Sequence, residues 1–143
     1  MRITQESDYA LRIVTAMAVR DGVTDAGSIS TETSVSQRFA LKILHKLVKG
    51  GIISSFKGAK GGYKLAKDAS EITLRQVIEL IDGPIAIARC VDDGESCSLN
   101  CDKAACIYHH IFDNISLELA KKLEQIRISD VLSKIHSKEE SDA

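Results

Sequence analysis

Apolar residues recur at helical spacing along the first third of the chain. In residues 5–20 they fall every three or four positions, which predicts a helix with one buried face. Residues 28–35 predict a short helix that ends near Ser34. Residues 36–51 give the clearest amphipathic pattern, and the double glycine at 50–51 ends it. We therefore expect three successive helices.

Two short stretches after the third helix, 52–56 and 62–66, have the composition of strands. They flank KGAKGG, a loop whose glycines permit positive φ. Three helices followed by a hairpin is the layout of a winged helix–turn–helix. Residues 1–83, which end with an amphipathic helix at 72–83, therefore predict a mostly α domain of this kind with a two-stranded β wing.

The second part of the chain has a different character. Residues 84–106 form a polar, cysteine-rich loop, and residues 104–126 return to helical spacing. A helix of ~22 residues is ~33 Å long, more than a small winged domain can cover. Its apolar stripe therefore predicts a homodimer seam, with burial inside one subunit as the alternative. The stripe consists of Tyr108, Ile111, Phe112, Ile115, Leu119, Leu123 and Ile126. Residues 107–135 are assigned to the dimerisation helix and a short return segment, and 136–143 to a disordered tail.

Composition narrows the class of protein. A chain of 143 residues with one proline, nine glycines and no tryptophan fits one mostly helical domain, or one small domain with an appended element, and an aliphatic core. The N-terminus lacks a signal-peptide pattern, and no stretch approaches the ~18 apolar residues of a membrane span. We therefore expect a cytoplasmic protein without a membrane partner, in which thiols stay reduced. No nucleotide loop or nucleophile–base arrangement is visible, which argues against an enzyme and a small-molecule substrate.

The net charge of −1 conceals an uneven distribution of charge. Residues 1–83 carry a net charge of +3, and residues 84–143 carry −4. Residues 36–67 contain eight lysines and arginines and no acidic residue, a footprint typical of proteins that contact phosphate. This pattern predicts a double-stranded DNA operator as the partner.

The basic helix and the hairpin tip supply the candidate DNA contacts. Any amphipathic helix has a charged outer face, but this face is uniformly positive and the adjoining loop has the same sign. Lysines on phosphates position a protein without reading bases, whereas Gln37 and Arg38 begin the helix and are candidates for base edges. Ser36 is either a DNA contact or only a helix cap. The lysine candidates are Lys42, Lys46, Lys57 and Lys60.

All four cysteines lie within 17 positions. Their spacing matches neither zinc knuckles nor ferredoxin-like runs, but closely placed thiolates repel one another and suit zinc or an iron–sulfur cluster by softness. His109, one helical turn after the last cysteine, and Asp8, arriving from another subunit, are further candidate ligands. The alternatives are a surface histidine and an acidic residue that favours the first turn of its helix. The cysteines are Cys90, Cys97, Cys101 and Cys106.

Several stretches resemble the IscR/NsrR/RirA group of bacterial winged-helix regulators, which also includes CymR. They are SDYALRIV at 7–14, ILHKLVKGGIISSFKGAKGGYKLA at 43–66, ITLRQVIELIDGP at 72–84 and CIYHHIF at 106–112, together with the spaced cysteines. The resemblance covers nearly the whole chain. It implies a homodimer with crossed long helices that holds a 2Fe–2S or 4Fe–4S cluster beside the seam.

The resemblance also implies roles for individual residues. Cys90, Cys97 and Cys106 match the three cysteines of the family pattern. Cys106 with His109 resembles the Cys-x-x-His that completes a 2Fe–2S site in IscR. Asp8 resembles the aspartate that completes a 4Fe–4S site from the neighbouring subunit in NsrR-like proteins. Cys101 departs from both patterns and is itself a candidate fourth ligand.

These observations predict a homodimeric DNA-binding transcriptional regulator that senses iron, redox or nitric oxide status through an iron–sulfur cluster. Loss, oxidation or nitrosylation of the cluster would reorder the cysteine loop and shift the recognition helices relative to half-sites ~34 Å apart. The alternatives are a winged-helix repressor with a structural zinc, a metal-free thiol sensor and, more distantly, an iron–sulfur electron carrier or enzyme. Metal analysis and a visible spectrum separate them.

Overall fold

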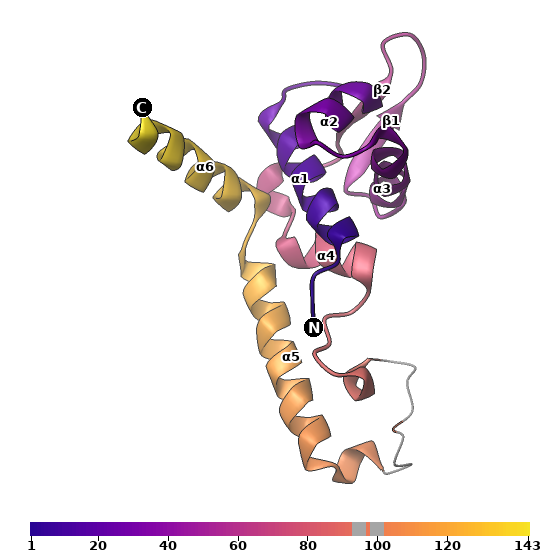
Figure 1. Cartoon of the computed structure of the whole chain (residues 1–143), viewed down its shortest axis with the longest axis vertical. Coiled ribbons are helices and arrows are strands. Elements are labelled where there is room, and N and C mark those ends of the chain that lie inside the picture. The colour runs from indigo at the N-terminus through magenta and orange to yellow at the C-terminus, as the bar shows by residue number, and fades with distance from the viewer. Residues whose placement is uncertain (93–96, 98–101) are drawn as a thin grey trace.

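The computed structural model describes residues 1–92, residue 97 and residues 102–143. A winged helix–turn–helix unit occupies the first half, and a long helix leads away from it (Figure 1). The elements of this unit are α1 (Gln5–Val19), α2 (Ala26–Thr33), α3 (Gln37–Lys49), β1 (Ile53–Phe56), β2 (Gly62–Leu65), a 3-10 turn η1 (Ala69–Glu71) and α4 (Leu74–Asp82). The predicted mostly helical fold with a two-stranded wing is confirmed.

An aliphatic core holds the winged unit together. The periodic residues of α1, among them Ile13 and Val14, pack against Ile43 and Leu47 of α3, and all four are fully buried. Ile128, from the last helix of the chain, also belongs to this core. Burying such side chains stabilises the fold by roughly 1.5–3 kcal/mol each. The C-terminal segment therefore contributes to the stability of the winged unit.

The turn between α2 and α3 orients the basic helix. Asp25 caps α2 by accepting hydrogen bonds from the Ser28 backbone N–H at 3.1 Å and the Ser28 hydroxyl at 2.6 Å, and these bonds lower the pKa of Asp25. This cap starts α2 two residues before the predicted 28–35 helix. Ser34 ends α2 with a left-handed φ of 55°. Ser36 then caps α3 by accepting a hydrogen bond from the Phe39 N–H at 3.4 Å.

The wing is an antiparallel hairpin in which Ile53 pairs with Leu65 and Phe56 with Gly62. Its second strand is also tied to the loop between α1 and α2, because Thr24 and Tyr63 exchange backbone hydrogen bonds of 2.9 and 2.8 Å. Gly62 is required there, since a Cβ at that position would lie 2.4 Å from the Thr24 carbonyl oxygen. The base of the wing is thereby fixed while its tip projects (Figure 1).

The second half contains two 3-10 turns, η2 (Arg89–Val91) and η3 (Lys103–Ala105), and the helices α5 (Ile107–Gln125) and α6 (Ile128–Asp142). The long helix begins later than the predicted residue 104. Asp102 accepts a hydrogen bond from the Ala104 N–H at 3.0 Å and starts a separate turn, so that α5 begins only at Ile107, with Cys106 in an extended conformation as the residue before it. No helix in the described part of the chain is both long and apolar enough to cross a bilayer.

The predicted disordered tail at 136–143 is wrong, because α6 continues to Asp142. The segment 128–142 contains neither glycine nor proline, and its lysines and glutamates have high helix propensities. A capping interaction also fixes its start, since the Arg127 N–H donates to the Asp130 carboxylate at 2.8 Å. The predicted return segment at 127–135 is therefore the first part of a longer helix.

Candidate DNA-binding surface and metal-binding region

The buried face of α3 determines which of its side chains face outward. Ala40, Ile43, Leu44 and Leu47 are fully buried, and the exposed side chains lie on the other side of the helix. Within the described part of the chain, the side chains of Gln37, Arg38 and His45 make no hydrogen bond or ion pair. The exposed positions on this outward surface are Gln37, Arg38, Leu41, Lys42, His45 and Lys49, while Phe39, also exposed, packs edge-on against Tyr9 of α1.

Sequence reasoning missed two residues of this surface, Leu41 and His45. Leu41 is 43 % exposed. The charge pattern drew attention only to the cationic positions, although a helical projection around the apolar residues would have placed both on the outward side. Ser36, the residue with two proposed roles, is a helix cap in this structure.

Two of the lysines on α3 are held by a carboxylate of α1. Lys46 Nζ lies 2.6 Å from Glu6 Oε1, and Lys42 Nζ lies 3.7 Å from Glu6 Oε2. The Phe39 ring meets the Tyr9 ring edge-on, with centroids 5.7 Å apart. Glu6, with a side chain only 19 % exposed, therefore competes with any phosphate for these two lysines.

The wing tip presents the other cationic candidates. Lys57 and Lys60 are exposed within a tight turn in which the Gly61 N–H donates to the Gly58 carbonyl at 2.9 Å. Gly58 has a φ of 103°, which favours glycine. The turn thus holds two lysines at the tip beside the basic helix.

The cysteine region is described in part. Cys90 belongs to η2, Cys106 is the N-cap residue immediately before α5, and Cys101 lies outside the described residues. Among the described residues, no three or more cysteine, histidine or acidic side chains are grouped so as to hold a metal ion. Asp8 of α1 forms an ion pair of 2.7 Å with Arg12, one helical turn away.

The two adjacent histidines of α5 differ in their contacts. His110 Nε2 lies 2.7 Å from the Ala104 carbonyl oxygen, a contact within the chain. His109 Nδ1 is buried and has no hydrogen-bond partner among the described residues. A buried polar atom without a partner is costly, so this nitrogen is the better candidate for a ligand.

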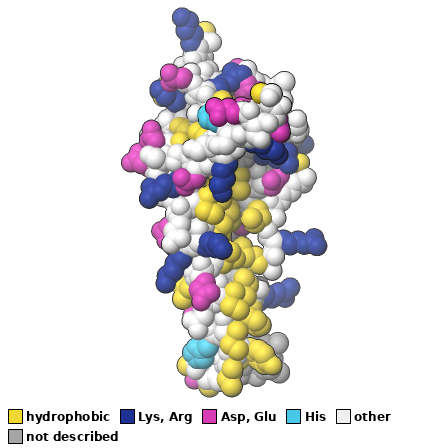
Figure 2. Space-filling view, turned by 90° about the vertical axis from the view of Figure 1, so that its left-hand side faces the viewer, with side chains coloured by type: hydrophobic (Ala, Val, Ile, Leu, Met, Phe, Trp, Pro, Cys, Tyr) yellow, Lys and Arg dark blue, Asp and Glu magenta, His cyan; other side chains and the backbone are white. Residues whose placement is uncertain are grey.

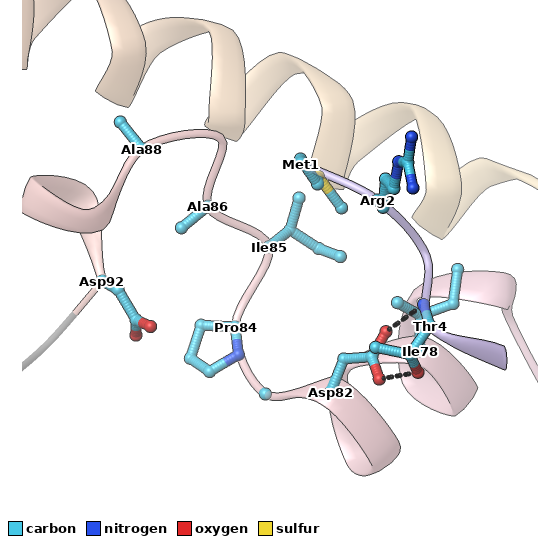
Figure 3. Close-up of a pocket in the computed structure, with 11 residues that line it drawn as sticks. Met1, Arg2, Thr4, Ile78, Asp82, Pro84, Ile85, Ala86, Ala88 and Asp92 are labelled. Atoms are coloured by element: carbon cyan, nitrogen blue, oxygen red, sulfur yellow. Dashed lines mark hydrogen bonds between the residues drawn. The ribbon is translucent and has the colours of Figure 1, made fainter. Parts of the chain in front are cut away.

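A pocket of about 220 Å³ lies between the N-terminal arm, residues 1–4, and the segment that leads to the cysteines (Figure 3). Thr4, which caps α1, donates from its N–H and its hydroxyl to the Asp82 carboxylate, at 3.2 and 2.5 Å. Pro84 and Ile85 follow Asp82 along the pocket wall. The arm that leads into Glu6 therefore contacts the segment that leads into Cys90.

The helix α5 has two distinct faces. One face meets its own subunit: Ser116 accepts a hydrogen bond from the Ile87 N–H at 3.0 Å, and Ala120 packs with Ile78 and Ile85. The other face carries exposed apolar residues, which form a band along the long helix in Figure 2. Ile115 precedes Ser116 and so lies about 100° away around the helix axis. The exposed apolar residues of this band are Ile107, Tyr108, Ile111 and Ile115, while Leu117 is exposed on another side of the helix.

The predicted seam residues therefore divide between the two faces. Tyr108, Ile111 and Ile115 are exposed. Leu119 and Leu123 are partly buried against the cluster around Ile78 in the same chain. The remaining members, Phe112 and Ile126, are also partly buried.

The connection between α5 and α6 is fixed to the winged unit. The Leu74 N–H donates to the Ile126 carbonyl at 3.0 Å, and the Ile128 N–H donates to the Ile72 carbonyl at 2.9 Å. Arg75 forms ion pairs with Glu79 at 3.2 Å and with Glu124 at 3.0 Å, and the Glu79 hydrogen bond is the main cause that raises the pKa of Arg75. The long helix is thereby attached to α4 at its C-terminal end.

Comparison with known proteins agrees with this architecture. The chain is 27 % identical over 135 residues to the transcriptional regulator NsrR of Oceanobacillus iheyensis, covering 92 % of this chain and 90 % of that protein. It is 29 % identical over 135 residues to IscR of Klebsiella pneumoniae, covering 93 % and 80 %. The structure of CymR, the global cysteine regulator of B. subtilis, superposes with a TM-score of 0.75 at 23 % identity, covering 94 % of this chain and 98 % of that one.

The family match extends over most of the chain. A sequence model of the Rrf2 family, described as iron-dependent transcriptional regulators, matches residues 3–134. Members of this family are transcriptional regulators rather than enzymes. The predicted resemblance to IscR- and NsrR-type regulators is thus confirmed, and the chain belongs to the Rrf2 family of transcriptional regulators.

Proposed function

We propose that the protein is a homodimeric regulator whose affinity for operator DNA is controlled by an iron–sulfur cluster bound at the N-terminal end of α5. The observation that carries the proposal is the position of its candidate ligands. Cys106 immediately precedes the helix that bears the exposed apolar band, and Cys90 lies in η2, which packs against the same helix. A change at these residues acts directly on the element that would join two subunits.

The DNA-binding half of the proposal is supported by charge and exposure. The outward side of α3 and the wing tip carry lysines and arginines and no acidic residue. Gln37 and Arg38 have no partner among the described residues and are free to meet base edges. The lysines Lys42, Lys46, Lys57 and Lys60 contact phosphates in this proposal.

The homodimer is supported by the unpartnered face of α5. Ile111 and Ile115 are 45 % and 44 % exposed, although their helix already buries a different face in its own subunit. A continuous exposed apolar band of this kind is typical of a protein–protein contact. Two copies packed along α5 would present two α3 helices with two-fold symmetry, which suits a palindromic operator.

The donor set fits an iron–sulfur cluster by its chemistry. Cys90, Cys97 and Cys106 supply thiolates, and we favour His109 as the fourth ligand because its buried Nδ1 has no hydrogen-bond partner among the described residues. Cys101 and Asp8 remain the alternatives, and Asp8 would have to give up its ion pair with Arg12. A bound cluster would supply redox- and nitric-oxide-sensitive coordination at this position.

The chain offers two routes from the ligands to the DNA surface. The segment between Asp82 and Cys90 lies against the N-terminal arm, whose Thr4 is held by Asp82. That arm leads into Glu6, which holds Lys42 and Lys46. The other route is α5 itself, which is tied to α4 through Arg75 and Glu124. Movement of the ligand-bearing segment would therefore alter both the pairing of Lys42 and Lys46 with Glu6 and the angle between the two subunits.

The proposal is tested by purifying the protein without air and measuring its absorption spectrum, iron and sulfide content. Visible absorption with iron and sulfide supports the cluster. A colourless protein with stoichiometric zinc would support a structural metal instead, and a metal-free protein would support a thiol sensor. Light scattering on the same sample checks the dimer.

A further inference from the structure

Leu41 stands out among the outward residues of α3. Its side chain is 43 % exposed, while its neighbours one turn before and after, Gln37 and His45, are polar. Arg38 and Lys42 flank it with positive charge. Single exposed leucines are common and need no explanation by themselves. What distinguishes Leu41 is that it belongs to neither hydrophobic cluster, whereas Phe39, the other exposed apolar residue of α3, packs edge-on against Tyr9.

The major groove restricts what such a side chain can meet. Base edges there present hydrogen-bond donors and acceptors, and the thymine C5-methyl is the apolar group among them. Packing a leucine against a polar edge removes water from that edge without replacing its hydrogen bond, which is unfavourable. Packing it against a methyl removes apolar surface of both groups from water, which is favourable.

We propose that Leu41 packs on the C5-methyl of a thymine in each operator half-site and so selects that base; this inference rests on the proposed docking of α3 in the major groove. The lysines of α3 cannot supply this selection, because phosphate contacts carry no base information. Arg38 lies about 4.5 Å earlier along the helix axis, close to the ~3.4 Å rise between base pairs. The thymine is therefore one or two base pairs from the base that Arg38 contacts.

The first step of the test obtains the DNA sequence. Duplexes are selected from a random pool with the purified full-length protein, and the enriched operator is then synthesised with deoxyuridine replacing one thymine at a time. Deoxyuridine pairs as thymine does and lacks only the methyl group. We expect about a fourfold loss of affinity at one thymine per half-site, which is the loss that corresponds to the free energy of burying one methyl group.

The second step assigns the methyl contact to Leu41. Leu41→Ala should bind the unmodified operator about fourfold or more weakly and should show no further loss when that thymine is replaced by deoxyuridine. Because the Leu41 side chain belongs to neither hydrophobic cluster, the variant should melt close to the wild-type temperature. Leu117→Ala is the matched control: Leu117 is 50 % exposed on α5 and should keep the wild-type response to deoxyuridine.

The outcomes separate this inference from the function on which it rests. A selected operator with no thymine sensitive to deoxyuridine, or a sensitivity that persists in Leu41→Ala, overturns the role of Leu41 and leaves DNA recognition intact. Failure to enrich any sequence overturns both. Loss of the deoxyuridine effect in Leu41→Ala alone supports the methyl contact.

Discussion

Glu6 of α1 and Lys46 of α3 form an ion pair in which Oε1 and Nζ are 2.6 Å apart. The same carboxylate lies 3.7 Å from Lys42 Nζ. An acidic side chain thus occupies the place that a DNA phosphate would take on two lysines of the basic helix. Binding DNA through these lysines requires that they leave Glu6 or share it.

We predict that Glu6→Gln binds DNA more tightly and with a steeper dependence on salt. Each lysine freed for a phosphate adds about 0.9 to the slope of log K against log salt, so the slope should steepen by about one to two. Glu139→Gln, which makes the same change of charge in α6, is the control. An unchanged slope together with an unchanged affinity in Glu6→Gln would mean that Glu6 does not compete with phosphate for Lys42 and Lys46.

We predict that Ile115→Glu separates the subunits. A charge buried without a partner in an apolar seam costs ~3 kcal/mol or more, which weakens dimerisation roughly 150-fold. Leu117→Glu is the control, because Leu117 is also exposed, 50 % against 44 % for Ile115, but lies about 200° around the helix from it. Sedimentation equilibrium measures the outcome, and a dimer of normal strength in Ile115→Glu would place the seam elsewhere.

We predict that His109→Ala alters the visible spectrum of the loaded protein, whereas His110→Ala leaves it unchanged. His110 already contacts the Ala104 carbonyl, while His109 Nδ1 has no such partner in the described chain. His109→Cys should keep a cluster and lower its reduction potential, since histidine ligands raise the potential relative to thiolates. If instead only Cys101→Ala or Asp8→Ala changes the spectrum, that residue is the fourth ligand.

We predict that Asp82→Ala weakens the coupling between cluster and DNA. The variant loses both hydrogen bonds to Thr4, which connect the N-terminal arm to the segment before Cys90. The ratio of DNA affinities with and without the cluster should move toward one, while the affinity of the cluster-free form changes little. Thr4→Ser, which retains the hydroxyl donor, should keep the wild-type ratio. If the ratio is unaltered in Asp82→Ala, the cluster acts on the DNA surface through α5 and not through the N-terminal arm.

The elements with regular periodicity were predictable from the sequence. The buried faces of α1 and α3 follow directly from the spacing of residues such as Ile13 and Ile43, and the glycine-rich loop marked the wing. The C-terminal end of α6 could not be predicted in this way, because a polar segment can form a helix or a solvated tail. Only the absence of helix breakers in 128–142 distinguishes the two.

Contacts between distant parts of the chain lay beyond sequence reasoning. The lysines of α3 were found from their charge, but their pairing with Glu6 depends on how α1 crosses α3. The stripe on α5 was found as one unit, but its division into a face against Ile78 and an exposed face depends on where the helix rests. Leu41 was missed because the charge pattern drew attention only to the cationic positions of α3.

The most direct test compares operator affinity of the same anaerobic preparation before and after gentle removal of its iron. We expect a coloured, iron- and sulfide-containing dimer whose affinity changes by roughly 5–150-fold on iron removal, the range of a coupling of ~1–3 kcal/mol. The variant in which Cys90, Cys97 and Cys106 are all replaced by alanine should bind the operator with the affinity of the iron-free protein. An anaerobic preparation that is colourless and iron-free, or an operator affinity that stays the same when the iron is removed, would contradict control by a cluster.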